Sequence, residues 1–568
     1  MPIEIQELTI KAVVESAARV VEVDSTKLED DVDGQLSSAM VIDRLHMPDT
    51  FTLVFHDPER DILERAQLAI GKRVKISTGG LTAEAAAVLI DGEVTSIEVE
   101  YDTTGSRAIV RGYDLSHRLT AGRKSKTFQG STYSDIAREI AGRANLETDI
   151  EATREVHDHV IQANQSDLDF LMQLAREVDY TCRVDGDTLI FRKAKPATDG
   201  PGAGTADGTE ATELVWGTSL LEFSARIAAA AQVSEVKVRG WDPVKKETII
   251  GQAEVTASHA DLSIKPATLS TSFGKNTLFI VDEPVQTQEA ADAKAKAKAE
   301  VAGGSAYEAT AVCQGSAELR AGTAISITGV DKSLEGKWTI SSSRHEFRQG
   351  SYRTTVECSG RQDRTLSGLV ANGLVGSGSG SGDRKRFNGV AVAIVTNNVD
   401  PDKRGRVKLK FPWLDDQVET HWATLAMPGA GANSGLVWIP QVGDSVIVAF
   451  EHGDIDYPVV LGGLWNGKDA APLGNDLFDA GKVKRSKIVS RKGHRLTFLD
   501  ADDKSGVALL SSNDKFKIEL NETDDELHIA SKGKLVIEAR ELEIKVDSGA
   551  KLEAGGEMKI KGATVALN

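Results

Sequence analysis

The stretch "GKLVIEARELEIKVDSGAKLEAGGEMKIKG" (533–562) alternates apolar and charged residues, with glycines between the segments. Because successive side chains of a β-strand point to opposite faces, this alternation predicts strands with one apolar face and one charged face. The sequence shows no helix or second apolar segment after this stretch that would cover the apolar face. We therefore expect the face to be buried by association with other copies of the chain.

The same alternation begins near Arg491. The residues predicted to form the buried core of the associated strands are Phe516, Ile518, Leu520, Leu527, Ile529, Leu535, Ile537, Leu542, Ile544, Val546, Leu552, Met558 and Ile560. Burial contributes roughly 1.5–3 kcal/mol for each such side chain, so the assembly would be much more stable than the single chain. The alternative is a meander packed on the preceding domain, whose pattern offers no matching apolar face.

Length and composition indicate several domains of a soluble globular protein. The 568 residues are 40% hydrophobic and 27% charged, and typical domain sizes of roughly 100–200 residues predict three to four domains. No run approaches the ~20 apolar residues of a membrane span. The start, "MPIEIQELTIKAVVESA", lacks the plan of a signal peptide, so we expect synthesis in the cytoplasm. A net charge of −18 argues against nucleic acid as a partner.

No residue pattern predicts catalysis, a cofactor or a metal. Cys182, Cys313 and Cys358 are far apart and odd in number, which favours buried strand residues over a disulfide framework. His157 and His159 lack a third ligand at suitable spacing and are predicted to be surface histidines. The sequence has neither a phosphate-binding glycine loop nor a nucleophile elbow. We therefore expect no enzymatic activity.

The first half of the chain is rich in strands from about Phe51, after an N-terminal arm. Two helices interrupt it, one capped by Thr132 with Asp135 three residues on, and one beginning after Ser166. Asp185–Gly186 marks the turn of a hairpin. Residues 196–213 are predicted to form a loop. The segment "TQEAADAKAKAKAEVA" is predicted to form a helix on the surface.

An internal repeat indicates two similar small β-barrels. "GEVT" at 92–95 matches "GKWT" at 336–339, and a Gly-Ser turn follows each, at Gly105 and Gly350. The alternative is two unrelated hairpins of ordinary composition. Three chains with two barrels each would present six barrels.

The run "GSGSGSG" (376–382) is a flexible linker and the clearest domain boundary. After it, short strands separated by Gly, Pro and Asp suit a five-stranded barrel of the oligonucleotide/oligosaccharide-binding (OB) type. The segment between this barrel and the strands near Arg491 is too short to hold a glycoside hydrolase domain with two positioned carboxylates.

Residues 388–467 resemble the barrel of phage baseplate assembly protein V, a domain that also occurs in VgrG, the spike of type VI secretion. The resemblance rests on Arg404-Gly405-Arg406-Val407, Phe411, Trp413, Trp438-Ile439-Pro440, Val442-Gly443-Asp444, His452-Gly453-Asp454 and Gly462-Gly463-Leu464-Trp465. The first half is similar to the hub of the same family in "GEVTSIE", "VRGYDLSHRL", "VIQANQSDLDFLMQLAREVDY" and "VKVRGWDP". His421 and His452 lie in resembling segments, for which the family implies no chemistry.

The resemblance implies a mainly β fold with some α (α+β): two tube-type barrels with inserted helices, an OB-fold barrel and a triple-stranded intertwined β-helix. The expected domains are a hub at 1–370, a linker at 371–387, an OB-fold barrel at 388–467, a connector at 468–490 and a needle at 491–568. Within the hub, barrels are expected at about 35–125 and 215–365, with a helical and hairpin insert at 126–195.

The resemblance also implies a function: a non-enzymatic, homotrimeric hub-and-spike of a contractile, phage-tail-like injection apparatus, released or held in the cytoplasm. The implied partners are a hexameric inner tube protein, baseplate proteins, effector cargo and a PAAR-like conical tip protein docking on Val565, Leu567 and Asn568. The compact hub and short needle favour this type over the longer VgrG spike. The alternatives are a type VI secretion spike, or an OB-fold module that binds glycan or nucleic acid through Arg404 and Arg406.

Overall fold

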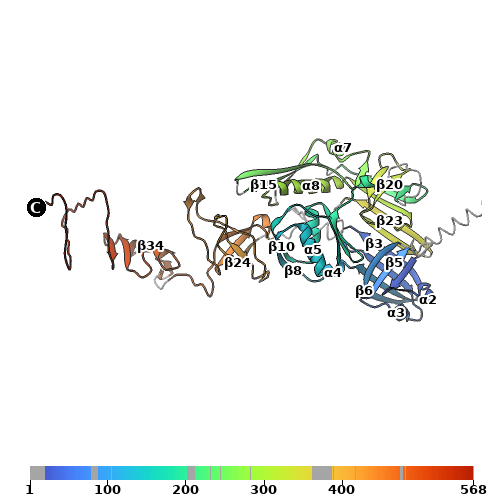
Figure 1. Ribbon diagram of the computed structural model, residues 1–568, viewed down its shortest axis with the longest axis horizontal. Coiled ribbons are helices and arrows are strands. Elements are labelled where there is room, and N and C mark those ends of the chain that lie inside the picture. The colour runs from blue at the N-terminus through green and yellow to red at the C-terminus, as the bar shows by residue number, and fades with distance from the viewer. Residues whose placement is uncertain are drawn as a thin grey trace, which may run out of the picture. The chain divides into compact units, whose positions relative to one another are not determined.

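The computed structural model describes residues 19–45, 47–78, 87–103, 105–200, 212–229, 232–242, 245–281, 283–348, 350–360, 387, 389–415, 417–473, 477–479 and 481–566. The chain forms two compact units, Met1–Leu464 and Trp465–Asn568 (Figure 1). The predicted linker at 376–382 lies outside the described residues, as do residues 1–18 of the arm predicted at 1–30. For the rest of the arm the prediction is wrong, because Arg19–Val23 and Thr26–Lys27 are strands of the large sheet.

An antiparallel sheet of eleven strands organises the first unit, in the order β14-β19-β23-β22-β3-β4-β7-β6-β5-β1-β2. Its N-terminal part comprises β1 (Arg19–Val23), β2 (Thr26–Lys27), β3 (Leu36–Arg44), β4 (Thr50–His56), β5 (Arg73–Thr78), β6 (Val88–Asp102) and β7 (Gly105–Asp114), with the short helices α2 (Asp30–Asp33) and α3 (Ile62–Arg65). Alternation sets the buried face of these strands: Phe51, Leu53 and Phe55 of β4 are all buried in one core.

The second barrel is formed by strands between residues 213 and 359. These are β13 (Glu213–Val215), β14 (Leu220–Ile227), β17 (Ala260–Leu262), β19 (Tyr307–Gln314), β20 (Ala324–Thr328), β21 (Gly336–Thr339), β22 (Ser342–Arg348) and β23 (Ser351–Ser359), with helix α7 (Pro266–Thr271). The strands β13, β20, β21 and β17 form a four-stranded sheet. Trp338 is fully buried in the core of this barrel.

Strand order and pairing show that the two barrels are repeats. The order β3-β4-β7-β6 in the first barrel corresponds to β14-β19-β23-β22 in the second. The first pair of each series carries a register shift at the same place, between Leu36 and Ser38 and between Leu220 and Glu222. The sequence-based prediction of a doubled barrel is therefore confirmed.

The backbone corrects the register in which the repeat was predicted. The Gly71 amide donates to the Val94 carbonyl and the Gly322 amide to the Ile340 carbonyl, both at 2.8 Å. Both glycines adopt positive φ, 84° and 85°. Val94 thus corresponds to Ile340 in the repeat. Gly92 therefore corresponds to Trp338 and not, as predicted, to Gly336. A shared glycine and threonine suggested a match two residues out of register.

One strand pair joins the two barrels. Strand β22 of the second barrel pairs antiparallel with β3 of the first, with His345 opposite Val41 and Phe347 opposite Ala39. All of these side chains are buried. Blue strands of the first barrel and yellow strands of the second therefore lie in one sheet (Figure 1).

A buried ion pair closes the same junction. The Nε of Arg320 donates to Oδ2 of Asp43 at 2.7 Å, and the Ala321 amide donates to the same oxygen at 3.2 Å. The Asp43 side chain is only 1% exposed and that of Arg320 18% exposed. Arg320 also donates to the carbonyl of Val88 in β6. The second barrel thus neutralises a carboxylate buried in the first.

The insert between the barrels has its own core. It contains α4 (His117–Thr120), β8 (Lys124–Ser131), α5 (Tyr133–Arg143), β9 (Glu147–Ile150), β10 (His157–Gln165), α6 (Asp167–Glu177), β11 (Tyr180–Asp185) and β12 (Thr188–Lys193). The predicted caps are confirmed: Thr132 and Asp135 form a reciprocal capping box, and the Ser166 side chain accepts from the Asp169 amide. The predicted hairpin is β11–β12.

A three-stranded sheet carries the predicted Ala-rich helix. The sheet has the order β16-β15-β18, from β15 (Glu235–Asp242), β16 (Glu247–Glu254) and β18 (Thr277–Ile280), and the helix is α8 (Gln288–Gly304). The prediction of a helix lying wholly on the surface is wrong, because Ala291, Ala295 and Ala299 are buried against this sheet (Figure 1). At Gly251 a Cβ would come within 2.2 Å of the Ala291 backbone, so only glycine at this position permits the contact.

The OB-type barrel has the strand order β25-β24-β29-β30-β26. Its strands are β24 (Val390–Asn397), β25 (Lys408–Lys410), β26 (Thr424–Leu425), β29 (Ser445–Phe450) and β30 (Pro458–Gly463); a small hairpin joins β27 (Ala430–Gly431) and β28 (Ser434–Gly435). Val407, Leu409 and Phe411 are fully buried in its core. The barrel contacts the insert: Thr127 donates to the Glu419 carbonyl, and the Ile161 amide donates to Asp456, both at 3.2 Å.

We expect Arg320→Met to destabilise the hub by about 3–5 kcal/mol, because it leaves the Asp43 carboxylate buried without its cation. Urea unfolding of the full chain at neutral pH measures this loss. Arg344→Met, on the exposed face of β22, is the matched control and should change the free energy of unfolding by less than about 0.5 kcal/mol. Equal effects of the two substitutions would contradict a structural role of the Arg320–Asp43 pair.

The junction should also weaken in acid through His345. Burial lowers the pKa of His345 to about 4, while an unfolded histidine titrates near pH 6.5. The unfolded chain therefore binds more protons between pH 6.5 and 4, and stability falls by about 1.4 kcal/mol for each pH unit in this window. The advantage of the natural chain over His345→Gln should shrink by about 2 kcal/mol from pH 6.5 to 5.

Urea unfolding of both chains at the two pH values measures this difference. Burial raises the pKa of the Asp49 and Asp114 carboxyls, so these two groups stabilise the folded chain as the pH falls, opposite to His345. Both carboxyls are present in the natural chain and in the variant, so the difference between the two chains reports on His345. An advantage that is the same at both pH values would show that His345 does not titrate as described.

Candidate functional site: the apolar face of the C-terminal strands

The second unit is built from antiparallel strands. Five of them form one sheet in sequence order: β33 (Arg485–Val489), β34 (Arg495–Ala501), β35 (Lys504–Leu510), β36 (Phe516–Asn521) and β37 (Glu526–Ser531). A small pair, β31 (Phe478–Asp479) and β32 (Lys482–Val483), precedes them. The strands predicted around Phe516 and Leu527 are confirmed as β36 and β37.

Register places most of the large apolar residues of this sheet on one face. Leu509 lies opposite Ile518, which lies opposite Ile529; Leu520 lies opposite Leu527. Directly opposite residues of an antiparallel pair share a face. On β34–β37 this apolar face consists of Leu496, Phe498, Val507, Leu509, Phe516, Ile518, Leu520, Leu527 and Ile529. The opposite face carries Lys517, Glu519 and His528, together with Leu499 and Ala508, which are buried.

This apolar face is uncovered in the single chain. The predicted core residues on β36 and β37 are 41–63% exposed, whereas interior residues of a stable sheet are buried on at least one face. Contiguous exposed apolar surface of this kind marks an interaction site. The sheet in isolation thus offers a surface for association.

The remaining predicted core residues lie beyond β37. Leu535, Ile537, Leu542, Ile544, Val546, Leu552, Met558 and Ile560 are 49–81% exposed. Residues 532–566 form no helix and pair into no strand within the chain, so the strands predicted for 533–562 are not present in the single copy. Among the described residues the chain supplies this segment with no neighbouring strand. Val565 is 51% exposed, and Leu567 and Asn568 lie outside the described residues.

Groups that could carry chemistry are occupied or buried elsewhere. Cys182, Cys313 and Cys358 are all buried in strands, as predicted, and burial raises the pKa of Cys182 and Cys313 to about 12. In the described part of the chain, no three His, Cys, Asp or Glu residues are placed to hold a metal ion.

The two histidines predicted to lie on the surface are instead half-buried. The ring of His157 stacks on Tyr133 at 4.1 Å between centroids. The ring of His159 lies 6.2 Å from that of His421 in the OB-type barrel, where burial and the neighbouring His421 lower its pKa to about 3. Both therefore act in packing, and the sequence could not reveal this because His159 and His421 are far apart in the chain.

Arg404 and Arg406, considered for ligand binding on the OB-type barrel, form hydrogen bonds within the loop that contains Asp400 and Asp402. Arg406 donates to Asp400 through Nε at 3.0 Å and Nη2 at 2.8 Å, and to Asp402 at 2.7 Å. The backbone amides of Arg404 and Arg406 also donate to Asp400. The Arg406 guanidinium holds the pKa of Asp400 well below its usual range. Because Asp400 and Asp402 engage Nε and Nη2 of Arg406, its Nε–Nη2 edge is not free to bind an external phosphate.

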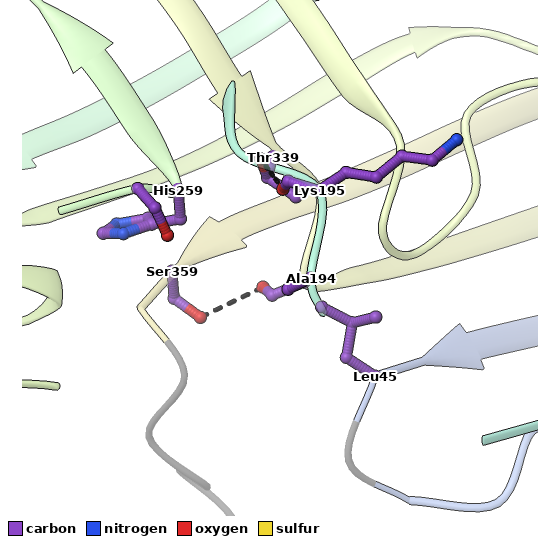
Figure 2. A pocket seen from close by; sticks show the side chains of 8 residues that line it. Leu45, Ala194, Lys195, His259, Thr339 and Ser359 are labelled. Atoms are coloured by element: carbon purple, nitrogen blue, oxygen red, sulfur yellow. Dashed lines mark hydrogen bonds between the residues drawn. The ribbon is translucent and has the colours of Figure 1, made fainter. Parts of the chain in front are cut away.

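One small pocket lies in the hub, between the barrels and the insert. It is lined by Leu45, Ala194, Lys195, Ser258, His259, Thr339, Ser341 and Ser359 (Figure 2). Thr339 donates to the Lys195 carbonyl at 3.4 Å across it. Its cavity volume of about 20 Å³ admits roughly one water molecule, which is too little for an organic ligand.

The chain thus combines doubled barrels, an OB-type barrel and a C-terminal array of strands. A family model described as the Alg8 N-terminal domain matches residues 22–349, more than half of the sequence. The chain therefore belongs to this family. A second model, the type VI secretion system/phage-baseplate injector OB domain, matches residues 391–465.

The curated relatives matched include spike proteins of type VI secretion. The chain is 34% identical over 128 residues to the type VI secretion system spike protein VgrG2a of Pseudomonas aeruginosa, a match that covers 21% of this chain and 15% of that protein. It is 29% identical over 118 residues to the actin cross-linking toxin VgrG1 of Vibrio cholerae, covering 20% of this chain and 11% of the relative. The chain thus spans a small part of the length of the curated relatives it matches.

A solved structure shares the fold. The lidded Francisella PdpA–VgrG complex contains a chain that matches with a TM-score of 0.52 at 10% identity, covering 90% of this chain and 80% of the other. At this identity the match shows the fold alone. Among the described helices, none combines the length and apolar character needed to cross a membrane.

Proposed function

We propose that the chain is the structural hub-and-spike of a contractile, phage-tail-like injection apparatus and that it works as a homotrimer. The apolar face of β34–β37, exposed in the single chain and continued by exposed apolar residues to Ile560, carries this proposal. Three copies wound about one axis would bury these faces and supply each extended segment with neighbouring strands. The result would be a triple-stranded β-helix needle, strong because its pairing runs between chains.

The doubled barrel supports the choice of three copies. Two equivalent barrels in each chain give six around a threefold axis, which fits a hexameric inner tube. The hub would then adapt the sixfold tube to the threefold needle. The similarity to spike proteins over the matched segments supports the same assignment.

Partners follow from the two ends of this assembly. The hub would contact the inner tube protein and baseplate proteins, and a PAAR-like conical tip protein would dock on Val565, Leu567 and Asn568 at the end of the needle. We propose that effector cargo is carried by separate chains and that this chain has no enzymatic activity. The particle would be assembled in the cytoplasm and either released or kept there, and the needle would pierce the target envelope.

The mass of the purified chain tests the assembly directly. Multi-angle light scattering should give about three times the 60.8 kDa of one copy. Because burial of the needle face drives association, the trimer should persist at micromolar concentration. A monomer under these conditions would overturn the proposed function.

Substitution in the needle tests which surface is responsible. Ile518→Glu should weaken association by about 3 kcal/mol or more, that is by more than a hundredfold, because a carboxylate would be buried in each of three copies. Dilution followed by light scattering measures the loss. Lys515→Glu adds a carboxylate at an exposed position beside the same strand and should leave the trimer intact. An equal loss in both variants would show that Ile518 is not in the core.

A further inference from the structure

The junction between the two barrels is a template for a second contact that one chain cannot make. In that junction β22 pairs with β3, with His345 opposite Val41. In the repeat, residues 96–102 of β6 correspond to β22. Residues 96–102 form a hairpin with β7, and β22 forms the equivalent hairpin with β23. Strand β14 corresponds to β3, because both carry the same register shift.

Both of these counterparts are uncovered edges. Strand β5 pairs with β6 only as far as Glu93, so among the described strands residues 97–102 pair with β7 alone. Strand β14 ends the eleven-stranded sheet. Val99 and Tyr101 are 48% and 61% exposed, whereas their counterparts in the junction, His345 and Phe347, are 0% and 2% exposed.

The backbone of β14 is oriented for pairing. In an antiparallel sheet successive residues direct their N–H and C=O groups to opposite neighbours. The Ala228 amide donates to the Ala306 carbonyl at 2.9 Å, so the even-numbered residues of β14 face β19. Phe223, Ala225 and Ile227 therefore direct their backbone groups outward.

The backbone of β6 matches it. The Asp114 amide donates to the Asp49 carbonyl at 3.0 Å, so the even-numbered residues of β7 face β4 and the odd-numbered ones face β6. Their partners in β6 are even-numbered, as Glu98 opposite Ile109 shows. Val99 and its odd-numbered neighbours thus direct their backbone groups outward.

We propose that β6 of one copy pairs antiparallel with β14 of the next copy, with Val99 opposite Ala225. This is the register of the β22–β3 junction transferred to the second pair of edges. It places Ile97 opposite Ile227 and Tyr101 opposite Phe223, so the apolar residues of the two edges share one face. The proposal rests on the homotrimer proposed above and specifies how its hub closes.

Charge on the other face agrees with this register. Glu98 comes to lie opposite Arg226. Within each copy Glu98 already pairs with Arg111 of β7, and Arg226 with Glu308 of β19. The contact would therefore create a row of alternating charge across four strands. Opposite charges in directly opposite positions stabilise an antiparallel pair.

The two edges are different surfaces, so the contact is head-to-tail. Such contacts form closed rings when the rotation between copies closes, and filaments otherwise. In a trimer every β6 edge meets a β14 edge, and three junctions between chains alternate with three junctions within chains. A second copy of this chain is thus the partner that covers both edges.

Disulfide trapping in the full-length chain tests this register. Glu100 and Ser224 lie opposite each other in the proposed pair, at a position without backbone hydrogen bonds between the two residues, where Cα atoms are about 4.5 Å apart. A disulfide bridges Cα atoms about 4.4–6.8 Å apart. The double variant Glu100→Cys/Ser224→Cys should therefore give covalent trimers on a non-reducing gel after mild oxidation, since the three natural cysteines are buried.

A matched control shifts the register by two residues. Glu100→Cys/Glu222→Cys should remain largely monomeric on the same gel, because diagonal positions lie about 7–8 Å apart. Mixing the single variants Glu100→Cys and Ser224→Cys should give cross-linked dimers, which shows that the bond joins two chains. Circular dichroism and light scattering of each variant establish that it is folded and trimeric.

The outcomes separate this inference from the proposed function. A trimer by light scattering without the expected disulfide, or with stronger cross-linking in the shifted control, would overturn the β6–β14 pairing and leave the homotrimer standing. A chain that is monomeric before oxidation would overturn the homotrimer and this pairing with it.

Discussion

The pairing of β22 with β3 is the contact on which the hub depends. It joins two barrels that are far apart in the chain into one sheet of eleven strands. Without this pairing, β22 and β3 would each be an exposed edge strand, and exposed edge strands promote aggregation. The Arg320–Asp43 ion pair lies at the same place and makes separation of the barrels costly, because it would leave a buried charge without its partner.

In the proposed homotrimer, the two ends of the chain use different means of association. In the hub, backbone edges with outward-directed amides and carbonyls would carry the pairing between copies, and side chains would select its register. In the C-terminal unit, the side chains of one apolar face are exposed over β34–β37 and continue beyond them. Pairing of edges determines how copies follow one another around an axis, whereas burial of a shared face supplies the stability of the assembly.

Local patterns predicted the elements that depend on neighbouring residues. The caps at Thr132 and Ser166 satisfy amides within one turn, so the sequence was sufficient to place α5 and α6. The doubled barrel was visible from glycines and alternation. Its register was two residues out, because "GEVT" and "GKWT" share letters at positions that the sheet does not superpose.

Contacts between distant segments were not predictable in the same way. The alanines of α8 led to the prediction of a surface helix. Their small size instead lets the helix approach β16 closely. His159 meets His421 only because the insert contacts the OB-type barrel. Nothing local to Val99 or Tyr101 marks them as an open edge. Their alternation with Glu98 and Glu100 resembles that of any strand with one face exposed.

The sequence by itself determined which residues alternate, where helices begin, and that the C-terminal strands carry an apolar face. It could do so because periodicity and capping act over a few residues. Only the tertiary structure decided that β22 meets β3, that the repeat is in the register of Val94 and Ile340, and that two edges are left over. Strand partners are chosen by burial and by backbone groups brought together from distant parts of the chain, and no local pattern encodes that choice.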